Sequence, residues 1–143
     1  MLLETPAVQI GQLAPGFALP DLDGNVVTHQ SAMGEGGLVV AFICNHCPYV
    51  KAIARDLAAD ARLLDAAGIK LVAIMSNDYE RHPADSPAKM REFAAAHDFG
   101  FPYLLDEDQR VARAYGAVCT PDFFGYDRKS KLQYRGRLDN GSV

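Results

Sequence analysis

The stretch LVVAFICNHCPYV, residues 38–50, decides how this chain folds. Its first six residues are all apolar, which is typical of a strand buried on both faces near the middle of a partly parallel sheet. Cys44 and Cys47 follow with two residues between them, and an amphipathic helical pattern begins directly after Cys47. We therefore expect a strand that ends on a Cys-x-x-Cys pair at the N-terminus of a helix.

This position gives the two cysteines a particular chemistry. The first turn of a helix offers unpaired N–H groups and the positive end of the helix dipole, which favour a thiolate over a thiol. Cys44 is predicted to be the exposed thiol that attacks, and Cys47 the more buried thiol that resolves the mixed disulfide. The intervening Asn45 and His46 would tune the redox potential, with a protonated His46 lowering the pKa of Cys44. Pro48 would make the first helical turn rigid.

The cysteine pair also permits two different interpretations. Two buried core cysteines could share this spacing by chance. A structural zinc site needs four ligands, usually two such pairs or a cysteine pair with a histidine pair. The chain has one pair and one further cysteine, Cys119, so zinc is disfavoured and no cofactor is expected. Three cysteines are also too few for a disulfide framework.

The length, charge and hydropathy of the chain argue against several classes of function. A chain of 143 residues suits one domain with one core. A net charge of −4, without a run of basic residues, argues against nucleic acid or an anionic membrane surface as a partner. The chain has no apolar run near the ~18 residues of a membrane span, and its first residues lack the pattern of a secretory signal. We therefore expect a cytoplasmic, reducing location.

Outside the cysteine stretch the pattern alternates between strand and helix. The expected elements are a hairpin within 13–28, a Gly-rich loop over 31–37, a helix over 48–67, a buried strand over 70–76, a polar loop over 77–87, a helix over 88–97, an extended segment over 101–105, a short helix over 106–115, and a hairpin formed by 123–126 and 131–136. This order predicts a parallel β–helix–β crossover and an α/β fold with a mixed central sheet and helices on both faces.

Five separated segments carry a family resemblance. Thr120-Pro121, before the last hairpin, follows the Cys-x-x-Cys pair in the order typical of the thioredoxin-like superfamily, and GQLAPGFALPDLDGNVV (11–27) resembles the N-terminal hairpin of its redoxin branch. Four further segments resemble bacterial thioredoxin-family, peroxiredoxin-like proteins, which are related to the alkyl hydroperoxide reductase/thiol-specific antioxidant family. These segments are FICNHCPYVKA (42–52), SNDYERHPADSP (76–87), the segment 101–127 and YRGRLD (134–139).

The resemblance covers nearly the whole chain and implies one thioredoxin-like redoxin domain over residues 1–143. In that group the chain continues past YRGRLDN through a further helix and strand, so the resemblance implies that the C-terminal helix is missing here. The pattern of residues indicates the same, since two main helices leave one face of the sheet without its last cover. Either the chain is truncated, or a partner chain, as in a homodimer, covers that face.

The resemblance also implies a function. A cis Thr120–Pro121 bond would face the cysteine pair and bind substrate, and Cys44 and Cys47 would act as a thiol–disulfide oxidoreductase. Its partners would be protein or small-molecule disulfides and thiols, or a peroxide, with a thioredoxin reductase or glutathione system as the reductant. The alternative is an antioxidant thiol peroxidase that uses Cys47.

Two departures from the family patterns bear on this choice. Aligned on Cys47, the threonine and proline of peroxiredoxins are replaced by Cys44 and Val40, which favours dithiol exchange over peroxidase chemistry. The buried aspartate of thioredoxin is replaced by Leu38, so the usual proton-relay carboxylate is missing.

Cys119 is the third candidate thiol. Next to Thr120-Pro121, it could lie near the pair as a further redox thiol, or bind a soft metal with Cys44 and Cys47 in a metal chaperone or sensor. It could equally be a small buried apolar residue. His82, Asp78 and Arg135 are weaker candidates, for which a solvated surface position is the favoured interpretation.

Overall fold

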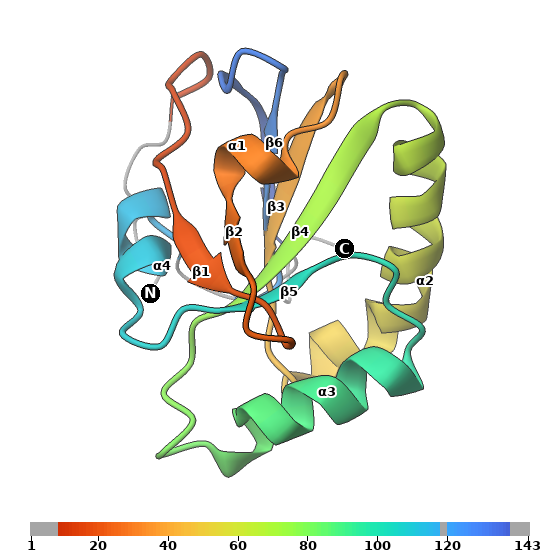
Figure 1. Cartoon of the computed structure of the whole chain (residues 1–143), viewed down its shortest axis with the longest axis vertical. Coiled ribbons are helices and arrows are strands. Elements are labelled where there is room, and N and C mark those ends of the chain that lie inside the picture. Colours follow the sequence, from red (N-terminus) through yellow and green to blue (C-terminus); the bar gives the residue numbers. More distant parts are fainter. Residues whose placement is uncertain (1–8, 118–119, 138–143) are drawn as a thin grey trace.

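The computed structural model describes residues 9–117 and 120–137, and Figure 1 shows how their elements are arranged. In chain order these elements are β1 (Ala18–Pro20), β2 (Val26–Thr28), α1 (His29–Ala32), β3 (Gly37–Phe42), α2 (Pro48–Ala66), β4 (Ile69–Met75), η1 (Pro83–Asp85, a 3₁₀ turn), α3 (Pro87–Ala96), β5 (Tyr103–Leu105), α4 (Arg110–Tyr115), β6 (Asp122–Tyr126) and β7 (Leu132–Arg137).

A five-stranded mixed sheet with strand order β5-β4-β3-β6-β7 forms the centre of the fold. β3 is the middle strand, parallel to β4 and antiparallel to β6, so Val40 lies opposite Val72 on one side and Phe124 on the other. β5 pairs parallel with β4, and β7 pairs antiparallel with β6. The predicted mixed sheet, parallel crossover and N-terminal hairpin are therefore confirmed, and the fold is thioredoxin-like.

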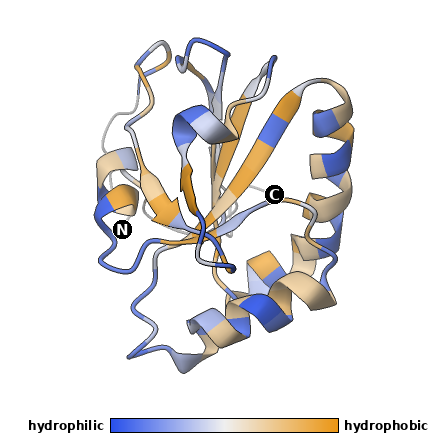
Figure 2. Cartoon of the chain, in the orientation of Figure 1, coloured by the Kyte–Doolittle hydropathy of each residue, from blue (hydrophilic) through white to orange (hydrophobic). Residues whose placement is uncertain are grey.

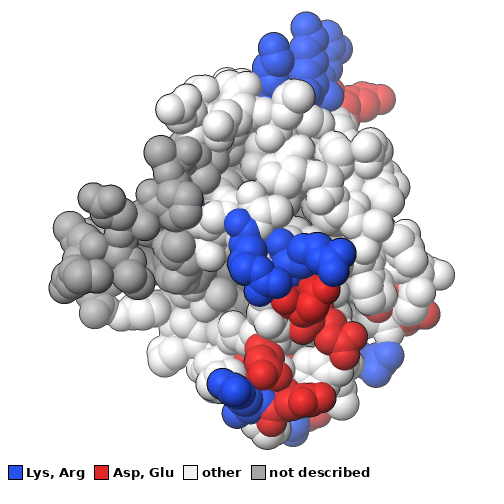
Figure 3. Space-filling view, turned by 90° about the vertical axis from the view of Figure 1, so that its left-hand side faces the viewer, with Lys and Arg blue, Asp and Glu red and all other residues white. Residues whose placement is uncertain are grey.

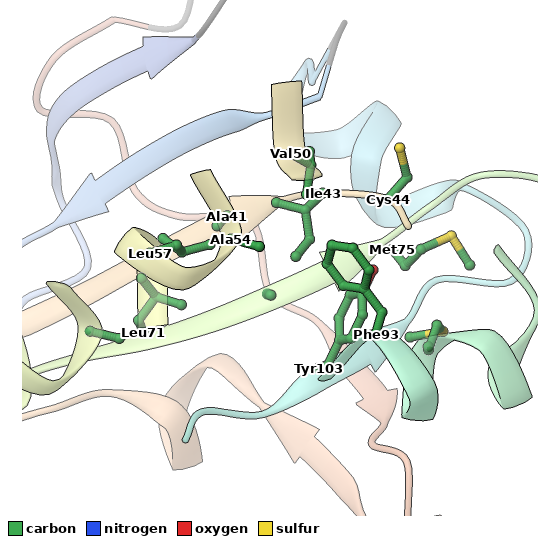
Figure 4. Packing of buried hydrophobic residues seen from close by; sticks show 13 residues of the cluster. Ala41, Ile43, Cys44, Val50, Ala54, Leu57, Leu71, Met75, Phe93 and Tyr103 are labelled. Atoms are coloured by element: carbon green, nitrogen blue, oxygen red, sulfur yellow. The ribbon is translucent and has the colours of Figure 1, made fainter. Parts of the chain in front are cut away.

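The two faces of this sheet are covered by different elements. Because side chains alternate along a strand, Ala41 and Ile43 pack on the side of α2 and α3, whereas Val40 and Phe42 pack on the side of α4 and the N-terminal segment. Figure 2 shows the central strands as mainly hydrophobic and α2 with polar residues interspersed. Figure 4 shows the first of these clusters, which extends to Cys44 at one end.

Two helices differ from the sequence prediction. The segment predicted as a Gly-rich loop begins instead within α1, because Thr28 and Ser31 form a capping box with hydrogen bonds of 3.0 and 2.9 Å. The short helix predicted from Asp106 starts only at Arg110. Asp106 lies outside it, fully buried, and its carboxylate accepts hydrogen bonds from the N–H groups of Val111 and Ala112 at 3.2 and 2.9 Å. It stabilises the helix start without being part of the helix.

Surface charge is mixed in sign. Figure 3, which views the side of the molecule that carries α4, shows acidic and basic side chains next to one another rather than a broad field of one sign. Within residues 9–117 and 120–137, no helix combines the length and apolar character needed to cross a membrane.

Arg135 is a structural residue and is not part of a solvated surface. Its guanidinium lies 2.8 Å from the carboxylate of Asp122, which is fully buried, and 4.7 Å from the ring centre of Phe124. Only 15 % of the Arg135 side chain is exposed. The sequence pattern predicts a solvated position for Arg135, because the pattern of one strand cannot show that β6 places an acid beside it.

We expect the substitution Arg135→Met to lower the free energy of unfolding by about 3–5 kcal/mol, because it removes the cationic partner of a buried carboxylate. Urea unfolding followed by circular dichroism measures this change. The matched control is Arg128→Met at an exposed turn position, for which a change within about 0.5 kcal/mol is expected. Equal effects of the two substitutions would contradict a stabilising role for the buried pair.

Candidate active site

The cysteine pair lies where β3 leaves the sheet and α2 begins. β3 ends at Phe42, Cys44 follows two residues later, and Cys47 is the N-cap residue of the 19-residue helix α2, with Pro48 in its first turn. The predicted strand–Cys-x-x-Cys–helix arrangement is confirmed. Cys47 therefore occupies the position at which the N–H groups and dipole of a long helix stabilise a thiolate.

The two thiols differ in exposure, in the order opposite to the prediction. Cys44 is 1 % exposed and packs in the core cluster, whereas Cys47 is half-buried. Figure 4 shows Cys44 at the end of this cluster, close to Met75. The reason is the path of the chain, since Cys44 still belongs to the buried end of the strand segment and Cys47 begins a helix at the surface. The expectation that Cys44 is the exposed thiol was wrong.

Burial also changes the acidity of Cys44. Removal from water raises the pKa of this thiol, and the nearby Asp85 carboxylate raises it further, while the hydrogen bond to Thr120 acts in the opposite direction. The net direction is upward, so Cys44 does not have the low pKa that the sequence analysis expected of an attacking thiol. Cys47 is therefore the more accessible of the two thiols, and Cys44 is the one held in the core.

Thr120 contacts both sulfur atoms. Its hydroxyl Oγ1 lies 3.3 Å from Cys44 Sγ, and its carbonyl oxygen accepts a hydrogen bond from Cys47 Sγ at 3.4 Å. The Thr120–Pro121 peptide bond is cis, as predicted, and Pro121 is buried. A residue more than 70 positions away in the sequence thus forms one wall of the dithiol site.

Asp85 is the main feature of the site that the sequence analysis missed. Its side chain is fully buried, and it accepts hydrogen bonds from the Asn45 backbone N–H at 2.7 Å and from Asn77 Nδ2 at 3.0 Å. His46 Nδ1 lies 2.5 Å from its second oxygen. A buried carboxylate is therefore present beside the pair, although it comes from the loop after β4 and not from the strand position that Leu38 occupies. The one local signal was an acid directly before Ser86, the N-cap of α3.

Asn45 and His46 link this carboxylate to the sheet and to the surface. The Asn45 side chain accepts a hydrogen bond from Tyr103 OH at 2.8 Å and donates one to the Ala84 carbonyl at 3.0 Å. The His46 ring, which is 40 % exposed, stacks on the ring of His82 with centres 5.2 Å apart. His82 was predicted to be a solvated loop residue; it is exposed, but it belongs to this site.

The remaining candidates fall into two groups. Cys119 lies outside the described residues, so its predicted roles stay predictions. Asp78, the other loop candidate, forms an ion pair of 3.6 Å with the exposed Arg81, and its backbone carbonyl accepts a hydrogen bond from the His82 N–H at 2.9 Å.

Thr120 also lines a pocket of about 350 Å³. It lies between α4 and the ends of β3 and β4, and its lining includes Phe42, Ser76, Ala112 and Arg113. Because Thr120 touches both sulfurs and also lines this pocket, a molecule bound there would lie next to the dithiol.

The comparison with known proteins agrees with this geometry. The model of the AhpC/TSA family matches residues 10–135. The chain belongs to the AhpC/TSA family. An oxidoreductase of the redox-thiol type is therefore the enzyme class of this chain.

Individual relatives divide between two kinds of thiol enzyme. Peroxiredoxin Bcp of Escherichia coli K12 is 28 % identical over 129 residues, which cover 89 % of this chain and 78 % of the relative. The thiol-disulfide oxidoreductase ResA of Bacillus cereus is 22 % identical over 125 residues, 87 % of this chain and 68 % of the relative. The crystal structure of an uncharacterized conserved protein from Geobacillus kaustophilus has 45 % identity and a TM-score of 0.88, and covers 98 % of this chain and 77 % of that one.

We expect an alkylating reagent to modify Cys47 before Cys44 in the reduced native protein, because Cys44 has almost no exposed surface. Brief treatment with iodoacetamide, followed by digestion and mass spectrometry, measures the order. The protein unfolded in guanidinium serves as the control, in which the two cysteines should react at similar rates. Faster labelling of Cys44 in the native protein would contradict the geometry of the site.

Proposed function

We propose that the protein is a thiol–disulfide oxidoreductase in which Cys47 attacks and Cys44 resolves. The observation that carries this proposal is the contact of both sulfurs with Thr120, combined with the burial of Cys44 and the accessibility of Cys47. Two thiols held against one residue can form a bond with each other, and only one of them can reach a substrate.

The exchange proceeds in two balanced steps. The Cys47 thiolate attacks one sulfur of a substrate disulfide, which forms a Cys47–substrate mixed disulfide and releases the other substrate sulfur as a thiolate. The Cys44 thiolate then attacks the Cys47 sulfur, which forms the Cys44–Cys47 disulfide and releases the second substrate thiolate. Two electrons pass from the protein to the substrate, and the substrate thiolates take up the two protons that the cysteines lost.

The proton of Cys44 has an acceptor close by. A carboxylate oxygen of Asp85, a ring nitrogen of His46 and Cys44 Sγ all lie within 4.8 Å of one another. A buried thiol needs such a group to form its thiolate during the second step, since water cannot surround it. This pair would replace the strand carboxylate that the sequence lacks.

The exchange reaction indicates which classes of substrate and reductant the protein would use. Protein or small-molecule disulfides would approach Cys47 along the Thr120 wall, with the adjoining pocket holding part of the substrate. A thioredoxin reductase or glutathione system in a reducing compartment such as the cytoplasm would return the protein to the dithiol state.

Mixed-disulfide trapping tests the assignment. We expect Cys44→Ser to accumulate a stable adduct on Cys47 when it is mixed with a model disulfide, because the resolving thiol is gone, whereas Cys47→Ser forms no such adduct at Cys44. Both variants should lose catalytic disulfide reduction. Mass spectrometry maps the adduct, and wild-type protein, which should not accumulate it, is the control. A trapped adduct on Cys44 in the Cys47→Ser variant would reverse the roles, and full activity of either variant would exclude a dithiol mechanism.

A thiol peroxidase is the second candidate, favoured by the AhpC/TSA family match and by the accessible position of Cys47. In this reaction the Cys47 thiolate takes one oxygen from a hydroperoxide, which forms a sulfenic acid and an alcohol or water. Cys44 then condenses with the sulfenic acid and releases water. Against it stands Cys44 itself, which occupies the position of the threonine found in peroxiredoxins.

Peroxide consumption separates the two candidates. We expect the Cys44→Ala variant, supplied with a small thiol as reductant, to consume hydrogen peroxide no faster than an ordinary accessible thiol does, because residue 44 then offers no hydroxyl to orient the peroxide. The rate is followed with a peroxide electrode, and free cysteine at the same thiol concentration is the control. A rate orders of magnitude above this control would favour the peroxidase.

A further inference from the structure

The residues that surround Cys44 bring three different kinds of metal-binding atom together. Cys44 contributes a sulfur, His46 a ring nitrogen and Asp85 a carboxylate oxygen, and these atoms lie within 4.8 Å of one another. They come from the end of the β3 segment and from η1, nearly 40 residues apart. We propose that Cys44, His46 and Asp85 form a zinc site in the reduced protein.

The donor set selects the metal class. Calcium and magnesium prefer sites made of oxygen ligands alone, and copper(I) prefers several soft sulfur ligands. One thiolate, one imidazole and one carboxylate are the mixed sulfur, nitrogen and oxygen donors that zinc accepts. Three protein ligands leave the fourth tetrahedral position for water. Cys47 is not in the cluster, and its thiol donates a hydrogen bond to the Thr120 carbonyl at 3.4 Å.

The distances between the three ligand atoms are near those of a zinc site, although the closest pair must open slightly to admit the ion. Zinc bonds of about 2.0–2.3 Å in a tetrahedral arrangement place the ligand atoms about 3.3–3.6 Å apart. His46 Nδ1 and Asp85 Oδ2 are closer than this, at 2.5 Å, and no pair in the cluster is farther apart than 4.8 Å. The His46 side chain is 40 % exposed, so its ring can adjust without moving the core.

The carboxylate is already held in place by groups that would not bind the metal. One oxygen of Asp85 accepts the Asn45 N–H at 2.7 Å, and the other accepts Asn77 Nδ2 at 3.0 Å. Asn45 is itself held by Tyr103 OH. Such outer hydrogen bonds orient ligands in metal sites. Among the residues that the structure describes, His46 is the one ion-pair partner of the buried Asp85, and zinc would add positive charge beside this carboxylate.

Binding involves no change of oxidation state. Zinc binds the Cys44 sulfur as a thiolate, the His46 ring through an unprotonated nitrogen and Asp85 as a carboxylate, and each proton that these ligand atoms carry beforehand passes to solvent. With its sulfur bonded to zinc, Cys44 could not resolve a mixed disulfide. This consequence rests on the proposed function, whereas the metal binding itself does not.

Direct metal binding tests the site. Reduced protein freed of metal is titrated with zinc chloride in competition with a chromogenic chelator, and cobalt(II) is added in a separate titration to report sulfur ligation by its charge-transfer absorption. We expect one zinc per chain. Cys44→Ser and His46→Ala should each weaken zinc binding by at least about tenfold, the scale on which even outer-shell changes act. Cys44→Ser should also lose the charge-transfer band.

Matched variants distinguish this site from other thiol sites. Cys47→Ser should keep both the zinc affinity and the cobalt charge-transfer band, and His97→Ala, at a histidine outside the cluster, should bind zinc as the wild type does. Asp85→Asn keeps a hydrogen-bond acceptor for the Asn45 N–H and should weaken binding; if it fails to fold, His46→Ala, at a half-exposed position, still decides the question. Loss of binding in Cys47→Ser with no effect of His46→Ala would show a dithiol metal site instead. Absence of one-to-one zinc binding to the wild type would overturn the proposal.

Discussion

The connection from β3 to α2 determines how exposed each of the two cysteines is. β3 is the middle strand of the sheet and is covered on both faces, and only five residues separate its last residue from the first residue of α2. Cys44 falls in the part of this connection that is still inside the core, and Cys47 falls where the helix reaches the surface. Two identical side chains therefore differ in exposure because of where the strand ends and the helix begins.

A buried carboxylate organises the other side of the site. Placing an unpaired charge in a protein interior costs several kcal/mol, so Asp85 requires donors that point at it. The Asn45 N–H, the Asn77 amide and His46 supply them, and together they draw the loop after β4 against the cysteine segment. The same loop brings His82 onto the His46 ring. Thr120 contacts both sulfurs, so a second segment that is distant in the sequence also meets the dithiol.

Cys44 takes part in both of the proposed reactions, disulfide exchange and zinc binding. The Cys44 sulfur contacts Thr120, which also contacts the Cys47 sulfur. The same Cys44 sulfur lies near His46 and Asp85. A disulfide with Cys47 and a bond to a metal would each use the same sulfur atom, so they exclude each other. The oxidation state of the pair and the occupancy of the metal site would then be coupled through one atom, without any movement of the sheet.

Much of the fold could be predicted from short-range patterns. The apolar run of β3, the helical spacing after Pro48 and the hairpin pattern within residues 13–28 are local signals, and the elements appear where these signals place them. The start of α4 was predicted too early, because Asp106 stabilises the helix through hydrogen bonds from a position outside it. Arg135 was assigned to the surface because its partner is on a neighbouring strand.

The sequence by itself determined the mixed α/β architecture, the placing of two cysteines at a strand–helix junction, and a Thr-Pro pair before the last hairpin. Periodicity and residue spacing carry this information, because they act over a few residues. Only the tertiary structure decided which thiol is buried and which carboxylate lies beside it. Asp85 and Thr120 reach Cys44 and its neighbours across about 40 and 76 residues of chain. Contacts over such separations depend on how loops pack across the edge of the sheet, and no local pattern records that packing.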